Sequence, residues 1–273
     1  MYMLGLSDRG VERFLPLLDC RGSKSSVDRD VMAAGQRARD LHRQAPRMRV
    51  RVRGVDGTGA AMAGQNRGVL FFVSIGPGGG LVAVQPIHED QTQKVREHVA
   101  RVMAQVGAEE LRTDEHSVYE GIVPDERHRL CLTHWRKSKG KRAHDLLGEA
   151  KVQAAVFEAD TMRELLELLR KKPRAPTVPE ELSRMVRRYI YARKGLPWKV
   201  NQLLQHVERT WEKVSDDPVD PTNNATERLI GLTLKIRAKT MRGFKSMDKA
   251  LAHPYLSFLL RGQDGVCDLT KVI

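Results

Sequence analysis

The sequence predicts an α/β protein in which a mixed sheet flanked by helices is interrupted by an all-α insertion and preceded by a small helix-turn-helix-like segment. Two observations support this fold class. Residues 47–56 alternate arginine with apolar side chains, and residues 68–75 and 80–85 are apolar runs, as is typical of strands. Between residues 141 and 211, apolar residues follow helical spacing with almost no strand signal. We therefore expect four segments: residues 1–46, 47–142, 143–214 and 215–273.

The charge of the chain predicts a polyanionic partner. It has 47 Lys and Arg against 34 Asp and Glu in 273 residues, which gives a formal net charge of +13. Each basic side chain that neutralises a backbone phosphate releases condensed counterions, so nucleic acid is the favoured partner. The longest apolar run, at residues 68–75, is too short to span a bilayer, and the N-terminus lacks the pattern of a signal peptide. We expect a cytoplasmic, nucleoid-associated protein with no membrane partner.

The first segment predicts two helices joined by a turn. Apolar residues of 8–18 have helical spacing, and Ser23 or Ser25 can cap a second helix that extends through Ala34. In helix-turn-helix geometry, Lys24 and Ser25 would lie at the start of the recognition helix and contact DNA. An ordinary helical hairpin packed on the neighbouring domain would give the same pattern.

The next segment predicts an antiparallel meander of three strands followed by alternating helices and strands. The Gly-Pro-Gly-Gly-Gly sequence at 76–80 suits a tight turn between the second and third strands. The elements expected after them are a helix over 90–106, a strand over 110–114, a short helix over 115–122, a strand over 127–132 and a helix from about Thr133. This succession resembles the ribonuclease H-like fold, in which the first and fourth strands are parallel neighbours. Because Asp56 and Asp114 end these two strands, we expect their carboxylates to converge.

The predicted insertion is helical and basic. Helices are expected over 143–157, 161–170, 178–193 and 198–214, with prolines between them. We interpret four basic residues at or within this region as DNA-binding: Arg136, Lys137, Arg187 and Arg188. A solvated helical face is the alternative interpretation.

A third acidic residue, Glu227, lies far along the chain. Asn223 and Asn224 form a turn that would cap a helix beginning near Ala225, which places Glu227 in its first turn. A capping acid without a catalytic task would show the same pattern. The residues that follow are strongly basic and are expected to bind DNA: Lys235, Arg237, Lys239 and Arg242.

Three motifs resemble those of DDE transposases with a ribonuclease H-like catalytic domain, especially Mutator-like and related bacterial insertion-sequence enzymes. They are Val-Asp56-Gly-Thr, Thr-Asp114 followed by Leu-Cys131-Leu-Thr-His134-Trp-Arg-Lys, and Asn-Asn-Ala-Thr-Glu227-Arg-Leu. The resemblance covers about residues 48 to 260, including a helical insertion between the second acid and the glutamate.

The resemblance implies that Asp56, Asp114 and Glu227 are catalytic and hold two Mg²⁺ ions, for which Mn²⁺ can substitute. The implied activity is cleavage and strand transfer of double-stranded DNA, at transposon ends and target, by a homo-oligomer on the DNA. A truncated or domesticated transposase that binds DNA without catalysis, or a structure-selective nuclease of the same fold, would carry the same motifs.

Cys131 and His134 form a possible structural pair. With His128, their spacing suggests zinc, but a closed structural zinc site needs four ligands and the only nearby addition is His144. We therefore expect a packing or DNA-proximal role, without zinc.

Overall fold

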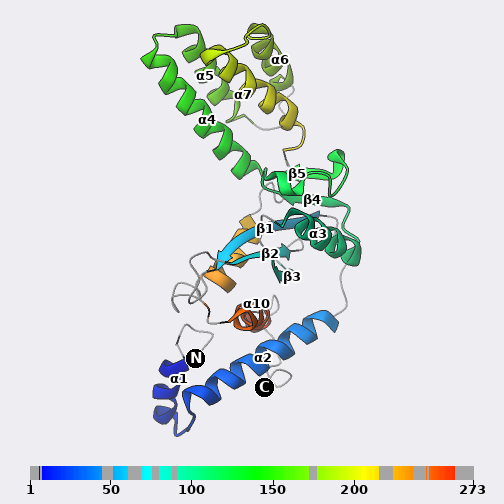
Figure 1. The fold of residues 1–273 in the computed structure, drawn as a ribbon, viewed down its shortest axis with the longest axis vertical. Coiled ribbons are helices and arrows are strands. Elements are labelled where there is room, and N and C mark those ends of the chain that lie inside the picture. The colour runs from blue at the N-terminus through cyan, green and yellow to red at the C-terminus, as the bar shows by residue number, and fades with distance from the viewer. Residues whose placement is uncertain are drawn as a thin grey trace. The chain divides into compact units, whose positions relative to one another are not determined.

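The structure is a computed structural model that describes residues 6, 8–44, 52–60, 69–75, 80–87, 91–171, 177–214, 224–235, 244 and 246–261. It is a mixed α/β protein rich in helix, which confirms the predicted class at that level. The chain divides into two compact units, residues 1–111 with 224–273 and residues 112–223. Figure 1 labels their elements. None of the described helices is long and apolar enough to cross a membrane. The four predicted segment boundaries stay predictions.

The first unit contains an antiparallel meander, as expected. It is formed by β1 (Val52–Ala60), β2 (Val69–Ile75) and β3 (Leu81–Pro86). The strand order of the whole sheet is β3-β2-β1-β4-β5. In this order β4 (Glu110–Thr113), which crosses the boundary between the two units, is the neighbour of β1, and β5 (His128–Leu130) is the neighbour of β4.

Asp56 lies inside its strand, and the prediction that it ends the strand is wrong. It pairs with Val73 of β2, and pairing continues as far as Ala60. Gly57 and Gly59 do not stop the strand, because the ladder is made by backbone groups and needs no side chain. Residues 47–51, which the sequence analysis assigned to the same strand, lie outside the described residues.

Helix α3 (Thr92–Val106) agrees with the predicted helix over 90–106. Its apolar face is buried through Val95, Val99 and Val102. Gly107 ends the helix with φ 60°, a left-handed conformation that glycine adopts without steric cost.

The two predicted N-terminal helices are present as α1 (Asp8–Phe14) and α2 (Lys24–Gln44), joined by the 3₁₀ turn η2 (Leu15–Leu18). The Ser23 hydroxyl accepts a hydrogen bond from the Ser26 amide at 3.1 Å, so the predicted cap is confirmed. Helix α2 continues about ten residues beyond Ala34, where the sequence analysis followed it, because its later turns pack on another helix. Lys24 and Ser25 do lie at its start, and their contact with DNA stays a prediction.

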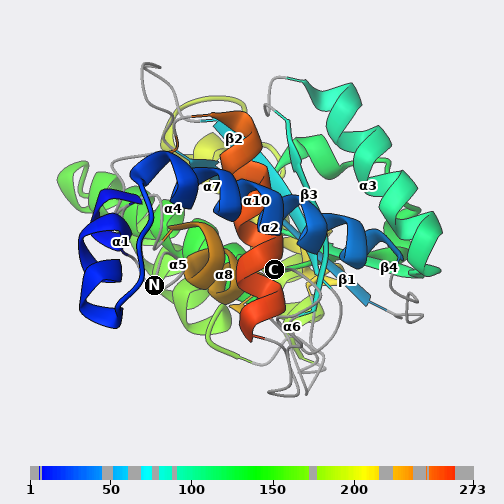
Figure 2. The ribbon, with the colours of Figure 1, turned by 90° about the horizontal axis from the view of Figure 1, so that it is seen from below.

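That other helix is α10 (Met247–Arg261), which crosses α2 in Figure 2. The two helices approach so closely at Gly35 that a Cβ atom built there would lie 2.4 Å from the Cβ of Ala252. Lys249 of α10 forms ion pairs with Asp28 of α2 and, at 3.9 Å, with Asp8 of α1. Helices from both ends of the chain therefore close the first unit.

Glu227 lies in the first turn of α8 (Asn224–Ile230), as predicted. This helix contacts β1 and continues into a π-helical turn, η5 (Gly231–Lys235). The expected apolar face is narrower than predicted, because Leu232 is 37% exposed while Leu234 is buried. Leu232 is two residues from Ile230 and two from Leu234, about 200° around a helix, so it points away from the face that those two residues bury.

The second unit is mainly helical: α4 (Leu132–Val152), α5 (Val156–Leu168), α6 (Val178–Arg188) and α7 (Gly195–Trp211), shown in Figure 1. Its first helix begins near Thr133, as predicted, and runs without a break to Val152. The sequence predicts a second, separate helix over residues 143–157. The chain turns at Ala154, which has φ 53°.

The core of the second unit is centred on Trp135 and Trp211, whose rings meet edge to face at 5.4 Å. The Trp135 indole N–H donates to the Thr210 hydroxyl at 2.8 Å, which satisfies a buried polar group. At the end of β5, just before α4, the Leu130 amide donates to the carbonyl of Lys213 at 2.7 Å. Strand β5 and helices α4 and α7 are thereby fixed to one another.

Gly35→Ala is expected to lower the free energy of unfolding by about 1–3 kcal/mol, because α2 and α10 must move apart to admit the new methyl group. Urea unfolding followed by circular dichroism measures this. Gly231→Ala is the matched control in the same unit, since no heavy atom lies within 4 Å of a Cβ built there. Equal losses in the two variants would contradict the close packing.

His98 of α3 is expected to make the fold sensitive to acid. Burial, with a smaller contribution from Arg101, lowers its pKa from 6.5 to about 4. Below pH 6.5 His98 is protonated in the unfolded chain, whereas in the folded chain it stays neutral until about pH 4. The free energy of unfolding therefore falls by up to about 3 kcal/mol as the pH is lowered through this window. Urea unfolding at pH 7 and pH 4.5 should show a smaller difference for His98→Leu than for the wild type; an unchanged difference would contradict the assignment.

Candidate functional site

Asp114 follows β4 directly, as predicted, and belongs to the second unit. Its carboxylate accepts a hydrogen bond from the His116 amide at 3.2 Å. Its carbonyl accepts one from the Thr113 hydroxyl at 2.6 Å. The helix predicted over 115–122 is wrong: only a 3₁₀ turn, η3 (Ser117–Tyr119), forms there. The His116 side chain accepts from the Val118 amide and ends the extended segment in a tight turn instead.

His128 stabilises the end of β4 from the neighbouring strand. Burial, the largest cause, and the charge of Lys213 lower its pKa, so the ring is neutral at pH 7. Because the Thr113 hydroxyl donates to the Asp114 carbonyl, His128 Nε2 must be the donor in its 2.8 Å contact with Thr113 Oγ1. The backbone at Asp114 is therefore held by a two-step hydrogen-bond relay.

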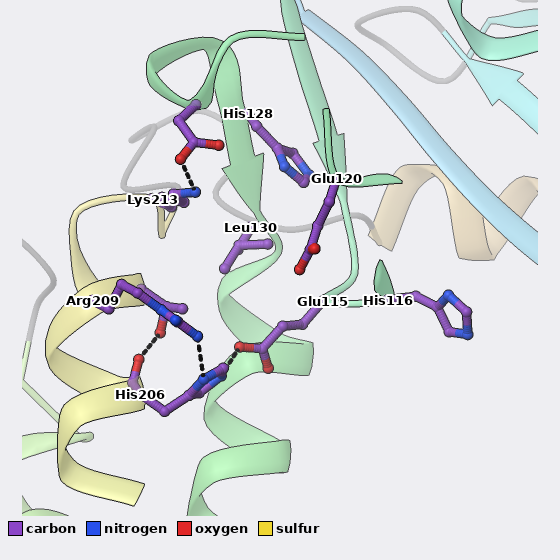
Figure 3. A pocket seen from close by; sticks show the side chains of 10 residues that line it. Glu115, His116, Glu120, His128, Leu130, His206, Arg209 and Lys213 are labelled. Atoms are coloured by element: carbon purple, nitrogen blue, oxygen red, sulfur yellow. Dashed lines mark hydrogen bonds and ion pairs between the residues drawn. The ribbon is translucent and has the colours of Figure 1, made fainter. Parts of the chain in front are cut away.

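Glu115, the next residue, is the centre of a charged network in the second unit. Its two carboxylate oxygens lie 2.5 Å from Lys139 Nζ and 2.5 Å from His206 Nε2. His206 Nδ1 in turn lies 3.2 Å from Arg209 Nη2. A carboxylate only accepts and a guanidinium only donates, so His206 donates to Glu115 through Nε2 and accepts from Arg209 through Nδ1. Figure 3 shows the contacts of His206 with Glu115 and with Arg209.

The side chains of Lys139 and Glu115 in this network are largely removed from water. The Lys139 side chain is only 7% exposed and that of Glu115 22%. Burial, with smaller contributions from the charges of Arg142 and Arg209, lowers the pKa of Lys139 more than the Glu115 carboxylate raises it. Burial alone would raise the pKa of Glu115, but the hydrogen bonds from His206 and Lys139 outweigh it, and the pKa of Glu115 falls below its ordinary value. Each charge therefore depends on its partner.

The network borders two cavities of the second unit. One, of about 390 Å³, is drawn in Figure 3 and extends from Glu115 and His116 to Lys213, which pairs with Asp125 at 2.8 Å. The other, of about 400 Å³, is lined by Arg142, Gln202, Gln205, His206 and Arg209. His206 and Arg209 line both.

Asp56 and Glu227 belong to the first unit. Both are half-buried, and the Asp56 carboxylate accepts a hydrogen bond from the Gly57 amide at 2.8 Å. Helix α8, which carries Glu227, contacts β1, which carries Asp56. Asp114 lies in the other unit, and within the described part of the chain no three His, Cys, Asp or Glu side chains gather in a group that could hold a metal ion. The convergence of the three acids stays a prediction.

The predicted DNA-binding residues differ in their surroundings. Lys137 and Arg187 are exposed, as is Lys235. Arg188 pairs with Glu164 at 3.0 Å, and Arg136 donates to the Lys171 carbonyl at 2.7 Å. These last two side chains are therefore already engaged within the protein. Arg237, Lys239 and Arg242 lie outside the described residues.

Cys131 and His134 lie at the start of α4, one turn apart. Cys131 is fully buried, its amide donates to the Thr113 carbonyl at 2.8 Å, and its carbonyl accepts from the Trp135 amide. The cysteine backbone thus joins β4 to α4. Its placement agrees with the packing role expected of it.

Sequence analysis missed Lys139, His206 and Arg209 as members of a site. One signal was available for Lys139: it lies four residues after Trp135 and four before Ala143, so all three share the buried face of α4. A lysine on such a face requires a buried carboxylate. No comparable signal pairs His206 with Glu115, which is 91 residues away in the chain.

Comparison with known proteins adds no family: no protein-family model matches the chain, and a search of curated proteins finds no significant match.

Glu115→Gln is expected to destabilise the protein by about 3 kcal/mol or more, because it leaves the Lys139 ammonium buried without its carboxylate. Adding Lys139→Met should recover part of the loss, as thermal and urea unfolding of the two single variants and the double variant would show. A double variant as unstable as the sum of the single variants would contradict the coupling.

The same carboxylate predicts a pH effect with a definite sign. Since the folded pKa of Glu115 lies below its ordinary 4.5, its stabilisation is fully present above about pH 4.5 and is lost as the pH falls through the folded pKa. Acid unfolding of Glu115→Gln should therefore lack this part of the loss seen in the wild type.

Proposed function

We propose that the chain is a DDE-type DNA transposase with a ribonuclease H-like catalytic domain. The observation that carries the proposal is the strand order β3-β2-β1-β4-β5, in which the strand of Asp56 is the neighbour of the strand that ends just before Asp114. The third acid, Glu227, lies in the first turn of a helix that contacts β1. The three motifs quoted above fall on these three positions.

The donor set suits magnesium. Asp56, Asp114 and Glu227 offer carboxylate oxygens, the hard ligands that Mg²⁺ and Mn²⁺ take. Bound there, two such ions would activate a water or a 3'-hydroxyl and stabilise the leaving oxygen. The role of the protein is to hold the acids: the ladder of β1 fixes Asp56, and the relay from His128 through Thr113 fixes the backbone at Asp114.

The partner in this proposal is double-stranded DNA, engaged by a homo-oligomer in the cytoplasm. The net charge of +13 supports it, since a polyanion is drawn to such a chain. The exposed positions Lys137, Arg187 and Lys235 are available for backbone phosphates. In this proposal these residues hold the DNA in place, because phosphate contacts position DNA without reading its sequence.

A second candidate is a DNA-binding protein without catalysis. The net charge of +13 and the exposed side chains of Lys137, Arg187 and Lys235 favour it, because they would bind DNA without any metal.

Cleavage tests decide between the two. Wild-type protein should nick a supercoiled plasmid that carries the DNA flanking its own coding sequence, with Mg²⁺ or Mn²⁺ and not with EDTA. The isosteric variants Asp56→Asn, Asp114→Asn and Glu227→Gln should each lose about 100-fold or more of the rate, because the loss of one ligand weakens stabilisation worth several kcal/mol.

Asp145→Asn, an exposed acid of α4, is the matched control and should keep the wild-type rate. Undiminished cleavage by any of the three variants would refute the site. DNA binding by the wild type with no cleavage under either metal would favour the second candidate.

A further inference from the structure

The second cavity described above has a lining that differs from the rest of the unit. All five of its residues are polar, two of them are arginines, and none is acidic: Arg142, Gln202, Gln205, His206 and Arg209. Arg142 comes from α4 and the other four from α7. The four α7 positions are spaced by three, one and three residues, so they form a single stripe along one face of that helix. We call this cavity the arginine cleft.

No acidic side chain in the described lining of the arginine cleft compensates the positive charge of its two arginines. The acid of the neighbouring network, Glu115, already binds Lys139 at 2.5 Å and His206 at 2.5 Å. Two guanidinium groups that face one cavity repel each other unless an anion lies between them. The cleft is therefore electrostatically suited to an anion.

The side chain of Arg209 is oriented by a hydrogen bond to His206. His206 Nε2 donates to Glu115, which leaves Nδ1 to accept from Arg209 Nη2 at 3.2 Å. A guanidinium has five N–H donors, and this bond uses one. A planar donor group held in place loses little entropy when it binds an anion, which favours the bidentate contact that arginine makes with phosphate.

We propose that the arginine cleft binds a backbone phosphate of DNA, with Gln202 and Gln205 as hydrogen-bond partners of the adjoining sugar or base. A volume of about 400 Å³ lies in the range of small-molecule sites, so the cleft takes a nucleotide-sized part of a strand. Glutamine amides offer both a donor and an acceptor, which suits nucleotide edges better than a simple ion.

The position of the cleft connects it with the proposed activity, on which this part of the inference rests. The neighbouring cavity shares His206 and Arg209 with it and is lined by Glu115 and His116, the two residues that follow Asp114. A strand held in the arginine cleft would therefore continue past the segment that carries the second acid.

Binding of a fluorescently labelled 30-base-pair duplex, measured by anisotropy in EDTA over a series of salt concentrations, tests the proposal. Arg142→Gln/Arg209→Gln should bind about tenfold more weakly or worse at 0.1 M salt. The slope of log affinity against log salt should fall by about one, for the single phosphate contact that is lost.

The matched control is Arg127→Gln/Arg163→Gln, which removes the same charge from two exposed arginines of the second unit that line neither cavity. It should bind within about twofold of the wild type. Gln202→Glu/Gln205→Glu changes two exposed residues without removing packing and should also weaken binding about tenfold. Circular dichroism melting confirms that each variant is folded.

Equal losses in the cleft variant and the control would mean that only net charge matters and would overturn the proposal, as would unchanged binding in both cleft variants. Because the assay contains no metal and records no cleavage, its result is independent of the proposed transposase activity. If the wild type binds DNA but never cleaves it, the proposal for the arginine cleft still stands and the transposase proposal fails. If the wild type cleaves DNA and the cleft variants bind it normally, only the proposal for the arginine cleft fails.

Discussion

The buried ammonium of Lys139 is the constraint on which the second unit depends. A lysine with a 7% exposed side chain must have a carboxylate beside it, and Glu115 provides one from the segment after β4. The same carboxylate orients His206 on α7, so one acidic group joins a strand end and two helices. Exchange of one partner for an apolar residue would leave the other charge without its counterion, and exchange of both would remove the charges but also the link between these elements.

The periodicity of the sequence was sufficient for most elements and insufficient for those set by tertiary contacts. The meander, α3, β4 and the start of α4 were predictable because their apolar spacing reflects burial on one side. The prediction of a helix after Asp114 was wrong because His116 caps a short 3₁₀ turn there. The predicted end of β1 at Asp56 was wrong because the glycines that follow it continue the backbone hydrogen bonding with the partner strand β2.

The candidate acidic site could be predicted only as a set of positions. The sequence placed Asp114 after a strand and Glu227 in a first turn, since both depend on local patterns. The charged network around Glu115 could not be predicted as a whole, because its members come from positions 115, 139, 206 and 209 and share no local motif. Ion pairs between distant residues are a property of the folded chain.

The contact between Gly35 and Ala252 bears on how the protein is made. The second unit is one continuous stretch, residues 112–223, whereas the first unit is assembled from residues before and after it. During synthesis the second unit can fold as soon as it has left the ribosome, but the face of α2 at Gly35 has no partner until α10 has been translated. Until then the face of α2 at Gly35 is uncovered, and the emerging chain is most exposed to aggregation and to chaperones during that interval.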